Sequence, residues 1–246
     1  MSDPSTLTPS IPTDGRAVVI GSEGTIGRAW TAFLRDTGSF VDVVGLSRRS
    51  SPPVDVTNEA SIAHAAATVA GDGVPLRCLV VASGLLHGTT PDGLDVQPEK
   101  SWRTLDAARM QHVMHVNAIG PALVLKHFLP QVPRAGRSLI VVLSARAGSI
   151  EENRIGGWYG YRAAKAALNQ IVRSAAAELG RKSKEAVCVT LHPGHVESPL
   201  SAPFGAGGHE TLEPGTSVQR AWEALAQVDA GGTGRTYDVD GTPIAF

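Results

Sequence analysis

The chain has 246 residues, 42% of them hydrophobic, and its 22 Lys and Arg nearly balance its 23 Asp and Glu, for a formal net charge of -1. That length can bury a large core in one domain, and the charge balance does not favour a nucleic-acid partner. No apolar run reaches the roughly 18 residues that a membrane helix needs, and the N-terminus lacks a signal-peptide pattern, so we expect a cytoplasmic protein without membrane partners.

Short apolar runs and helical patterns alternate along the chain. Residues 1–14, rich in Pro, Ser and Thr, are expected to form a flexible tail, and residues 15–246 one domain. Apolar runs alternating with helices are typical of a parallel sheet covered on both faces, so we predict an α/β fold with a doubly wound parallel sheet. The expected strands begin at Arg16 and then lie within residues 39–49, 76–84, 137–145, 186–194 and 235–241; the expected helices end at Gly38 and then lie within residues 60–70, 106–131, 158–179 and 217–228.

Three features interrupt this pattern. Pro121 is expected to end, kink or loosen the helix of residues 106–131, because proline lacks the N–H group that the helix needs. The loops at residues 85–105 and 197–216 are rich in Pro and Gly and are long for a compact domain. Because long loops of this kind are often functional, we expect both to act as substrate lids.

A glycine-rich loop, "GSEGTIG" at residues 21–27, follows the first strand and opens the first helix. Glycines allow a tight turn and let the backbone approach a pyrophosphate, whose charge then lies at the helix N-terminus. This context favours a dinucleotide site in a Rossmann-type fold over a plain strand-to-helix turn. The loop is not a P-loop, because no Gly-Lys-Ser/Thr follows it.

Two tyrosines and one lysine in "GGWYGYRAAKAALNQ" raise the question of which tyrosine does chemistry. Residues four apart share a helix face, so Tyr161 and Lys165 project side by side, whereas Tyr159 has Ala163 at that offset. An ammonium beside a phenol lowers a pKa of about 10 toward the range of a general acid/base. The alternative interpretation is a surface Tyr/Lys pair without a catalytic role.

The cysteines and histidines do not indicate a metal site. Cys78 and Cys188 both fall in apolar, strand-like runs, which is typical of buried thiols rather than of a disulfide or a metal pair. His192 and His195 have no carboxylate or cysteine partners at ligand spacing. We therefore expect no bound metal.

With the glycine loop at the first strand-to-helix turn and Tyr161-x-x-x-Lys165 after a later strand, the chain resembles the short-chain dehydrogenase/reductase family over nearly its whole length. The segments "LSARAGSI", "GGWYGYRAAKAALN" and "LHPGHVESPLSAPF" look most like the C-factor-like carbonyl reductase branch. The resemblance implies a single Rossmann-type domain, NADP or NAD as cofactor, a small-molecule carbonyl or alcohol substrate, and a homodimer or homotetramer.

The resemblance also implies roles for individual residues. Tyr161 would protonate the carbonyl oxygen in reduction and act as base in the reverse direction, and Lys165 would lower its pKa and hold the nicotinamide ribose. Asn117 in "HVNAIGP" would support a water that joins Lys165 to solvent. The cofactor-binding residues implied are Gly21, Ser22, Glu23, Thr25, Ile26, Ser47, Arg48, Arg49, Asp55, Val56, Ala82, Ser83, Gly84, Asn117, Tyr161, Lys165, Pro193, Gly194, Val196 and Ser198.

The chain departs from the family pattern where the catalytic serine is expected. The aligned position falls on Ala145, and Ser144 is one residue early. Side chains alternate along a strand, which points Ser144 away from the substrate, although a bulge could turn it inward. Ser144 therefore remains our candidate for the catalytic hydroxyl. His87, Arg146 and Ser149 are further positions that could face a substrate.

The end of the second strand bears on the choice of cofactor. NAD-binding versions of this fold place an acidic residue there, about 20 residues beyond the glycine loop. This chain has Ser47, Arg48 and Arg49 instead, and Asp42 lies too early. The planar fork of arginine suits a phosphate, so we expect a preference for NADP(H), with NAD(H) as the alternative.

Together these features predict a carbonyl reductase or alcohol dehydrogenase that transfers a hydride between NADP(H) and a ketone, aldehyde or secondary alcohol. The competing hypothesis is a dinucleotide-binding sensor or signalling protein without turnover. The missing serine at position 145 favours the sensor, and the presence of Tyr161, Lys165 and Asn117 opposes it.

Overall fold

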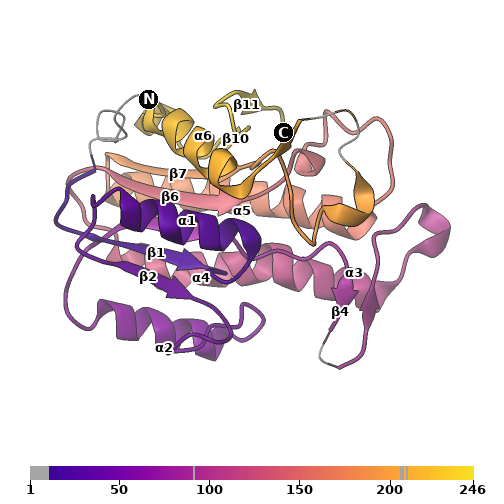
Figure 1. Ribbon diagram of the computed structural model, residues 1–246, viewed down its shortest axis with the longest axis horizontal. Helices are drawn as coiled ribbons and strands as arrows, with labels where there is room; N and C mark the ends of the chain where they lie inside the picture. The colour runs from indigo at the N-terminus through magenta and orange to yellow at the C-terminus, as the bar shows by residue number, and fades with distance from the viewer. Residues whose placement is uncertain (1–10, 91, 206–207, 209) are drawn as a thin grey trace.

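A seven-stranded sheet forms the centre of the molecule in the computed structural model, which describes residues 11–90, 92–205, 208 and 210–246 (Figure 1). The strand order is β11-β10-β7-β6-β3-β1-β2, and neighbouring strands are parallel except for β10 and β11. The predicted parallel sheet is confirmed, with an antiparallel edge strand that was not predicted. The strands are β1 (Arg16–Ile20), β2 (Val43–Leu46), β3 (Leu76–Val81), β6 (Ser138–Leu143), β7 (Ala186–Leu191), β10 (Thr236–Tyr237) and β11 (Pro243–Ile244).

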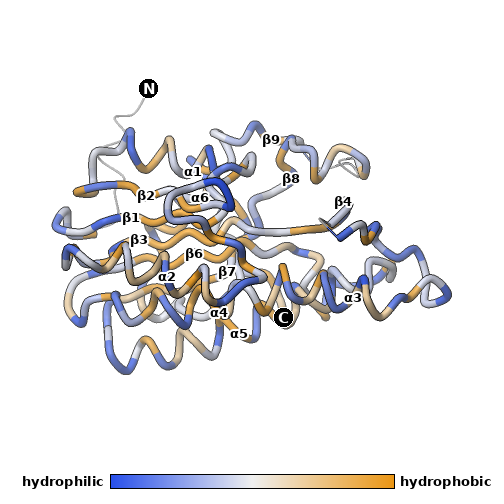
Figure 2. The backbone as a smooth tube through the Cα atoms, turned by 90° about the horizontal axis from the view of Figure 1, so that it is seen from below, coloured by the Kyte–Doolittle hydropathy of each residue, from blue (hydrophilic) through white to orange (hydrophobic). Residues whose placement is uncertain are grey.

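Helices cover both faces of this sheet, and strand alternation sends side chains to each face. Val18 and Ile20 of β1 pack in the same core cluster as α2, α4 and α5, whereas Ala17 and Val19 pack in the cluster of α1 and α6. Figure 2 shows the hydrophobic strands running between these outer helices. The single doubly wound domain is confirmed. The helices are α1 (Thr25–Asp36), α2 (Glu59–Ala70), α4 (Gly120–Phe128), α5 (Tyr159–Lys182) and α6 (Pro214–Ala226).

The strand β1 lies between β3 and β2, the kind of position at which open α/β sheets have a crevice at the carboxyl ends of their strands. After β1 the chain forms β2 on one side of β1 and then β3 on its other side, so the connections from β1 to β2 and from β2 to β3 run in opposite directions across the sheet. In open α/β sheets, ligands bind at the carboxyl ends of strands at such a switch point. The glycine loop directly follows β1 and therefore lies at this crevice.

The helix predicted for residues 106–131 is interrupted, as Pro121 indicated. It consists of α3 (Ala107–Met114), a π-helical turn at His115–Ile119, α4, and a 3-10 turn at Leu129–Gln131. Because Pro121 has no N–H, it cannot donate to the carbonyl of Asn117. A wider turn accommodates this missing hydrogen bond, and such π-turns are frequent at functional sites.

The two long loops contain short elements and contact each other. Residues 85–105 include the hairpin of β4 (Gly88–Thr89) with β5 (Asp95–Val96), and residues 197–216 include β9 (Thr211–Leu212), which pairs with β8 (His195–Val196). His87 Nε2 lies 3.2 Å from the carbonyl oxygen of Leu200, and its ring centroid is 5.4 Å from that of Phe204. The role of these loops as lids stays a prediction.

The expected flexible tail of residues 1–14 needs a correction at its end. Residues 1–10 lie outside the described residues. Ile11, however, is buried in the core cluster of α1 and α6, and Asp14 accepts a hydrogen bond of 2.9 Å from Nε of Arg77 on β3. The chain is therefore packed against the domain from Ile11 onward.

Candidate active site

Close backbone packing shapes the glycine loop. Gly21 has φ +80°, and a Cβ there would lie 3.0 Å from the backbone N of Ser83; a Cβ at Gly27 would lie 2.1 Å from the carbonyl oxygen of Gly21. Only glycine fits both positions. The N-terminus of α1 follows Gly24 without a side-chain cap, so its first N–H groups are available to an anionic ligand.

A cavity of about 670 Å³ lies at the carboxyl ends of β1, β2 and β3. Residues implied by the resemblance line much of it, which places the glycine loop, the arginines after β2 and the end of β3 around one space. These residues are Gly21, Glu23, Ser47, Arg48, Arg49, Asp55, Val56, Ala82, Ser83 and Gly84.

Other lining residues were missed from the sequence. His112 and Val116 lie four apart across α3 and the π-turn, a spacing that could have marked one lining face. Thr89 and Thr90 come from the hairpin of the 85–105 loop, where no sequence pattern pointed to the cavity. The remaining lining residues are Ile20, Gly24, Val54, Thr57 and Leu85.

The residues present fit a dinucleotide. Gly24 and Gly84 line the cavity, yet a Cβ at Gly24 would meet only the carbonyl oxygen of Gly21 at 3.4 Å, and a Cβ at Gly84 only Oδ1 of Asn117 at 3.4 Å. Protein packing alone does not require glycine there. Because neither glycine has a side chain, a ligand can approach the protein backbone closely at both positions.

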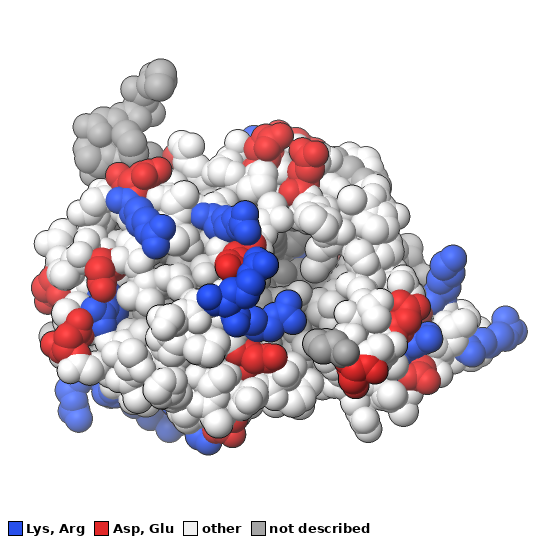
Figure 3. Space-filling model, turned by 60° about the horizontal axis from the view of Figure 1, so that its bottom comes forward, with Lys and Arg blue, Asp and Glu red and all other residues white. Residues whose placement is uncertain are grey.

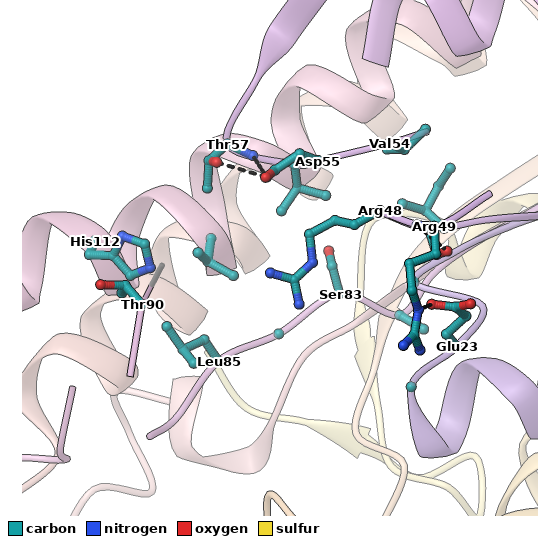
Figure 4. A pocket seen from close by; sticks show the side chains of 18 of the residues that line it. Glu23, Arg48, Arg49, Val54, Asp55, Thr57, Ser83, Leu85, Thr90 and His112 are labelled. Carbon is teal, nitrogen blue, oxygen red and sulfur yellow. Dashed lines mark hydrogen bonds and ion pairs between the residues drawn. The ribbon is translucent and has the colours of Figure 1, made fainter. Parts of the chain in front are cut away.

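Charged side chains gather at the β2 end of the cavity. Figure 4 shows the Arg48 guanidinium pointing into the space, while Arg49 turns to Glu23, with Nε 2.7 Å from Oε2. On the face drawn in Figure 3, Lys and Arg side chains collect beside a hollow with acidic side chains among them. Asp42 accepts a hydrogen bond from Arg16 Nε at 2.9 Å and does not line the cavity.

The other implied cofactor residues do not line this cavity. Ile26 packs against the core cluster of α1 and α6, Val196 is buried, and the Ser198 hydroxyl lies 3.1 Å from that of Ser201. Their contact with the cofactor stays a prediction. The same holds for Ser22, Thr25, Asn117, Tyr161, Lys165, Pro193 and Gly194.

Tyr161 and Lys165 lie together near the start of α5, as their spacing predicted. Lys165 is buried, and its Nζ lies 5.7 Å from the centroid of the Tyr161 ring. The ammonium also donates to the carbonyl oxygen of Leu143 at 2.9 Å, which ties α5 to the end of β6. Trp158 packs edge-on against Tyr161, with centroids 6.2 Å apart.

The sequence predicted a lowered pKa for the Tyr161 phenol, and this direction is wrong. Burial raises the pKa of the Tyr161 phenol to about 12, and burial lowers the pKa of Lys165 to about 8. Desolvation disfavours the charged form of each group. Tyr161 is therefore protonated at neutral pH, the form that an acid needs.

Asn117 uses its side chain to hold a loop. It lies fully buried in the π-turn; its Oδ1 accepts from the N–H of Leu85 at 3.0 Å, and its Nδ2 donates to the carbonyl of Leu85 at 2.7 Å. The amide thus satisfies both backbone groups at the start of the 85–105 loop. Its part in a water relay stays a prediction.

Glu99, which the sequence analysis missed, caps helix α5. The α5 helix begins after Trp158, whose φ of 52° is left-handed and whose side chain provides no cap. Glu99 is buried, its Oε2 accepts from the N–H of Gly160 at 3.1 Å, and its carbonyl accepts from the N–H of Trp158 at 2.6 Å. These residues are 61 positions apart, so no local pattern could reveal the cap.

The structure gives no support to Ser144 as the catalytic hydroxyl. Ser144 is buried and donates to Oδ1 of Asn169 on α5 at 2.7 Å, whereas Ala145, next along the chain, is partly exposed. The Ser144 side chain points as strand alternation predicts, and no bulge rotates its hydroxyl toward the substrate side. Ser149 is buried and accepts from the N–H of Glu152, and Arg146 is paired with Glu152 and Asp238.

A family model matches the part of the chain that carries Tyr161 and Lys165. The model described as short chain dehydrogenase matches residues 47–207, more than half of the chain. The chain belongs to the short-chain dehydrogenase family. The resemblance expected from the motifs is confirmed, and the protein is an oxidoreductase of this family.

Relatives of this short-chain dehydrogenase include proteins with different names. C-signal of Myxococcus xanthus is 32% identical over 142 residues, 58% of this chain and 81% of that protein. The 1-hydroxy-2-glutathionyl-2-methyl-3-butene dehydrogenase of a Rhodococcus strain is 26% identical over 235 residues, 92% and 96% of the two chains. An NADPH-bound carbonyl reductase from chicken fatty liver shares the fold, with a TM-score of 0.81 and 21% identity over 99% of this chain and 98% of that one.

Two further features of the described part of this short-chain dehydrogenase concern metals and membranes. Among residues 11–90, 92–205, 208 and 210–246, no three His, Cys, Asp or Glu side chains come together as metal ligands. None of the described helices is long and apolar enough to cross a membrane. Cys78 and Cys188 are buried free thiols, as predicted.

The pKa of Lys165 predicts how cofactor affinity depends on pH. The resemblance implies that Lys165 holds the anionic cofactor, which would favour the charged ammonium; affinity for NADPH should then be full below about pH 8 and should fall as the pH rises above that value. A charge-assisted contact is worth about 1.5–3 kcal/mol, so we expect roughly tenfold weaker binding between about pH 7 and pH 10. Fluorescence titration measures this, with Lys165→Met as the control; an equal pH dependence in both proteins contradicts the assignment.

Proposed function

We propose that this short-chain dehydrogenase is an NADP(H)-preferring carbonyl reductase that also oxidises secondary alcohols, acting in the cytoplasm as a homodimer or homotetramer. The observation that carries the proposal is the pairing of Lys165 with a protonated Tyr161, in a fold that also has a cavity lined by the glycine loop and by Arg48. The chicken-liver carbonyl reductase with the same fold, described as NADPH-bound, supports the choice of cofactor.

The residues of the chain would divide the work as follows. When bound, the nicotinamide cofactor supplies or accepts the hydride. Tyr161 gives the proton of its hydroxyl to the carbonyl oxygen of a ketone or aldehyde, and takes it back when an alcohol is oxidised. Lys165 holds a positive charge beside the phenol and the cofactor. Gly21, Gly24 and the N-terminus of α1 receive the pyrophosphate.

The 2′-phosphate of NADP(H) would be recognised by Arg48. Its guanidinium points into the cavity, and Asp42, the acidic residue nearest the second strand, pairs with Arg16 instead. A guanidinium binds phosphate through two parallel hydrogen bonds. We place the substrate under residues 85–105 and 197–216, because His87 and Leu200 already join these segments beside Phe204 and Trp158.

A dinucleotide-binding sensor is the second candidate function. Ala145 lacks the hydroxyl that the family pattern places there, and the neighbouring Ser144 donates to Asn169. The similarity to a protein named C-signal also favours a signalling role. The retained Tyr161 and Lys165 oppose it, because a sensor has no need of a proton donor.

The first prediction separates an enzyme from a sensor. NADPH oxidation is followed by its absorbance with a panel of ketones and aldehydes. We expect turnover that Tyr161→Phe abolishes, because only the hydroxyl is lost, while NADPH affinity changes by no more than about threefold. Tyr159→Phe is the matched control and should keep its activity. Cofactor binding without turnover of any carbonyl would favour the sensor.

The second prediction concerns the missing serine. A hydrogen-bond donor to the developing oxyanion contributes about 10²–10³ in rate. Position 145 is partly exposed and lies two residues after Leu143, the residue that Lys165 contacts. Ala145→Ser should therefore raise kcat on a simple carbonyl, whereas Ser144→Ala should mainly lower the melting temperature. Steady-state kinetics decides between them. Abolished turnover in a folded Ser144→Ala variant would return the catalytic role to Ser144.

The third prediction concerns cofactor choice. NADPH should bind more tightly than NADH, by roughly tenfold to a hundredfold for one charge-assisted contact. The double variant Arg48→Ala, Arg49→Ala should lose most of that difference while keeping its affinity for NADH. Fluorescence titration with both cofactors measures it, and equal affinities in the unmutated protein would defeat the prediction.

A further inference from the structure

A carboxylate lies at the cationic end of the cofactor cavity. Glu23 belongs to the glycine loop, yet it lines the cavity together with Ser47, Arg48 and Arg49 from the end of β2. Its Oε2 accepts from Arg49 Nε at 2.7 Å, so a side chain from one loop reaches across to the other (Figure 4). The hydrogen bond from Arg49 lowers the pKa of Glu23, which is therefore ionised at neutral pH.

The ion pair is too exposed to serve mainly as a structural support. The side chain of Glu23 is 39% exposed and that of Arg49 is 74% exposed. Exposed ion pairs contribute little to stability and are screened by salt. A ligand that carries its own charge can therefore compete with either partner.

The two cofactors differ at this end of the cavity. In NAD(H) the adenosine ribose offers hydroxyl groups, which donate to a carboxylate; in NADP(H) a phosphate replaces one hydroxyl and is repelled by a carboxylate. Folds that bind NAD usually place the acid at the end of β2. Here Asp42 is bound to Arg16, and Glu23 brings a carboxylate to the same end from the glycine loop.

We propose that Glu23 is a specificity-determining residue that weakens the preference for the 2′-phosphorylated cofactor and lets the protein bind both dinucleotides. It acts in two ways: its charge opposes the phosphate, and its hydrogen bond holds Arg49 away from it. Arg48, which points into the cavity, remains available to the phosphate. This inference rests on the proposed function, because it assumes that the cavity binds a dinucleotide.

The test uses ligands that isolate this end of the cofactor. Adenosine 2′,5′-bisphosphate and adenosine 5′-monophosphate are titrated by calorimetry into the full-length protein and into Glu23→Gln. Removing the charge should raise the affinity ratio of the bisphosphate to the monophosphate by about tenfold, and the NADPH-to-NADH ratio should rise in the same direction. Because glutamine can still accept a hydrogen bond, the monophosphate should lose no more than about threefold.

A matched control and a second variant sharpen the test. Glu210→Gln removes another exposed carboxylate that pairs with an arginine, Arg220, at 2.8 Å outside the cavity, and it should leave both ratios unchanged. If Glu23 acts partly through Arg49, then Glu23→Gln should raise the ratio less in an Arg49→Gln background than in the unmutated protein. Thermal unfolding verifies that each variant is folded.

The outcomes are distinguishable. An unchanged or lower ratio in a folded Glu23→Gln variant, with dinucleotides still bound, overturns this inference and leaves the proposed function intact. If the unmutated protein binds neither dinucleotide nor either nucleotide probe, the proposed function fails and this inference fails with it. A rise of equal size in Glu210→Gln would reduce the effect to net charge and would also overturn the inference.

Discussion

The contact of backbone on backbone at Gly21 and Gly27 is the constraint on which the cavity depends. A Cβ at Gly27 would lie 2.1 Å from the carbonyl of Gly21, and one at Gly21 would lie 3.0 Å from the backbone N of Ser83. These contacts bring the uncapped N-terminus of α1 against the carboxyl ends of β1 and β3. Any side chain there would displace α1, and the cavity would lose the N–H groups and the positive end of the helix dipole together.

The end of the molecule that carries Tyr161 depends on a different kind of contact, in which side chains form hydrogen bonds with irregular backbone segments. Pro121 opens a π-turn, and Asn117 within it bonds both backbone groups of Leu85. Trp158, the residue before α5, has a left-handed conformation and its side chain does not cap the helix. Glu99 caps the helix instead. Both sets of hydrogen bonds attach the 85–105 loop to helical backbone: the first to the π-turn that contains Asn117, and the second to α5, which carries Tyr161. The placement of that loop and the placement of the phenol are therefore linked.

Sequence reasoning succeeded where a short-range rule was sufficient and failed where packing over long distances decided the outcome. The alternation of strands and helices, and the i, i+4 spacing of Tyr161 and Lys165, follow from local geometry. The pKa of Tyr161 does not, because burial sums over every element packed around the ring. Glu99 could not be found, because 61 residues separate it from the N–H that it caps. Ser144 was an intermediate case: alternation indicated its direction, but only the position of Asn169 on α5 settled it.

The end of the site that holds Lys165 and the end that holds the charged side chains after β2 also differ in how much a substitution is expected to affect stability. Lys165 is buried and donates to the carbonyl of Leu143 at the end of β6, so replacing it also removes a structural contact. Arg48, Arg49 and Glu23 are exposed, and substitutions at exposed positions usually cost little stability. The charges at this end of the cavity can therefore change while the fold and the Tyr161/Lys165 pair stay constant. This separation is a physical reason why chains with one fold and one Tyr/Lys pair can differ in the dinucleotide that they prefer.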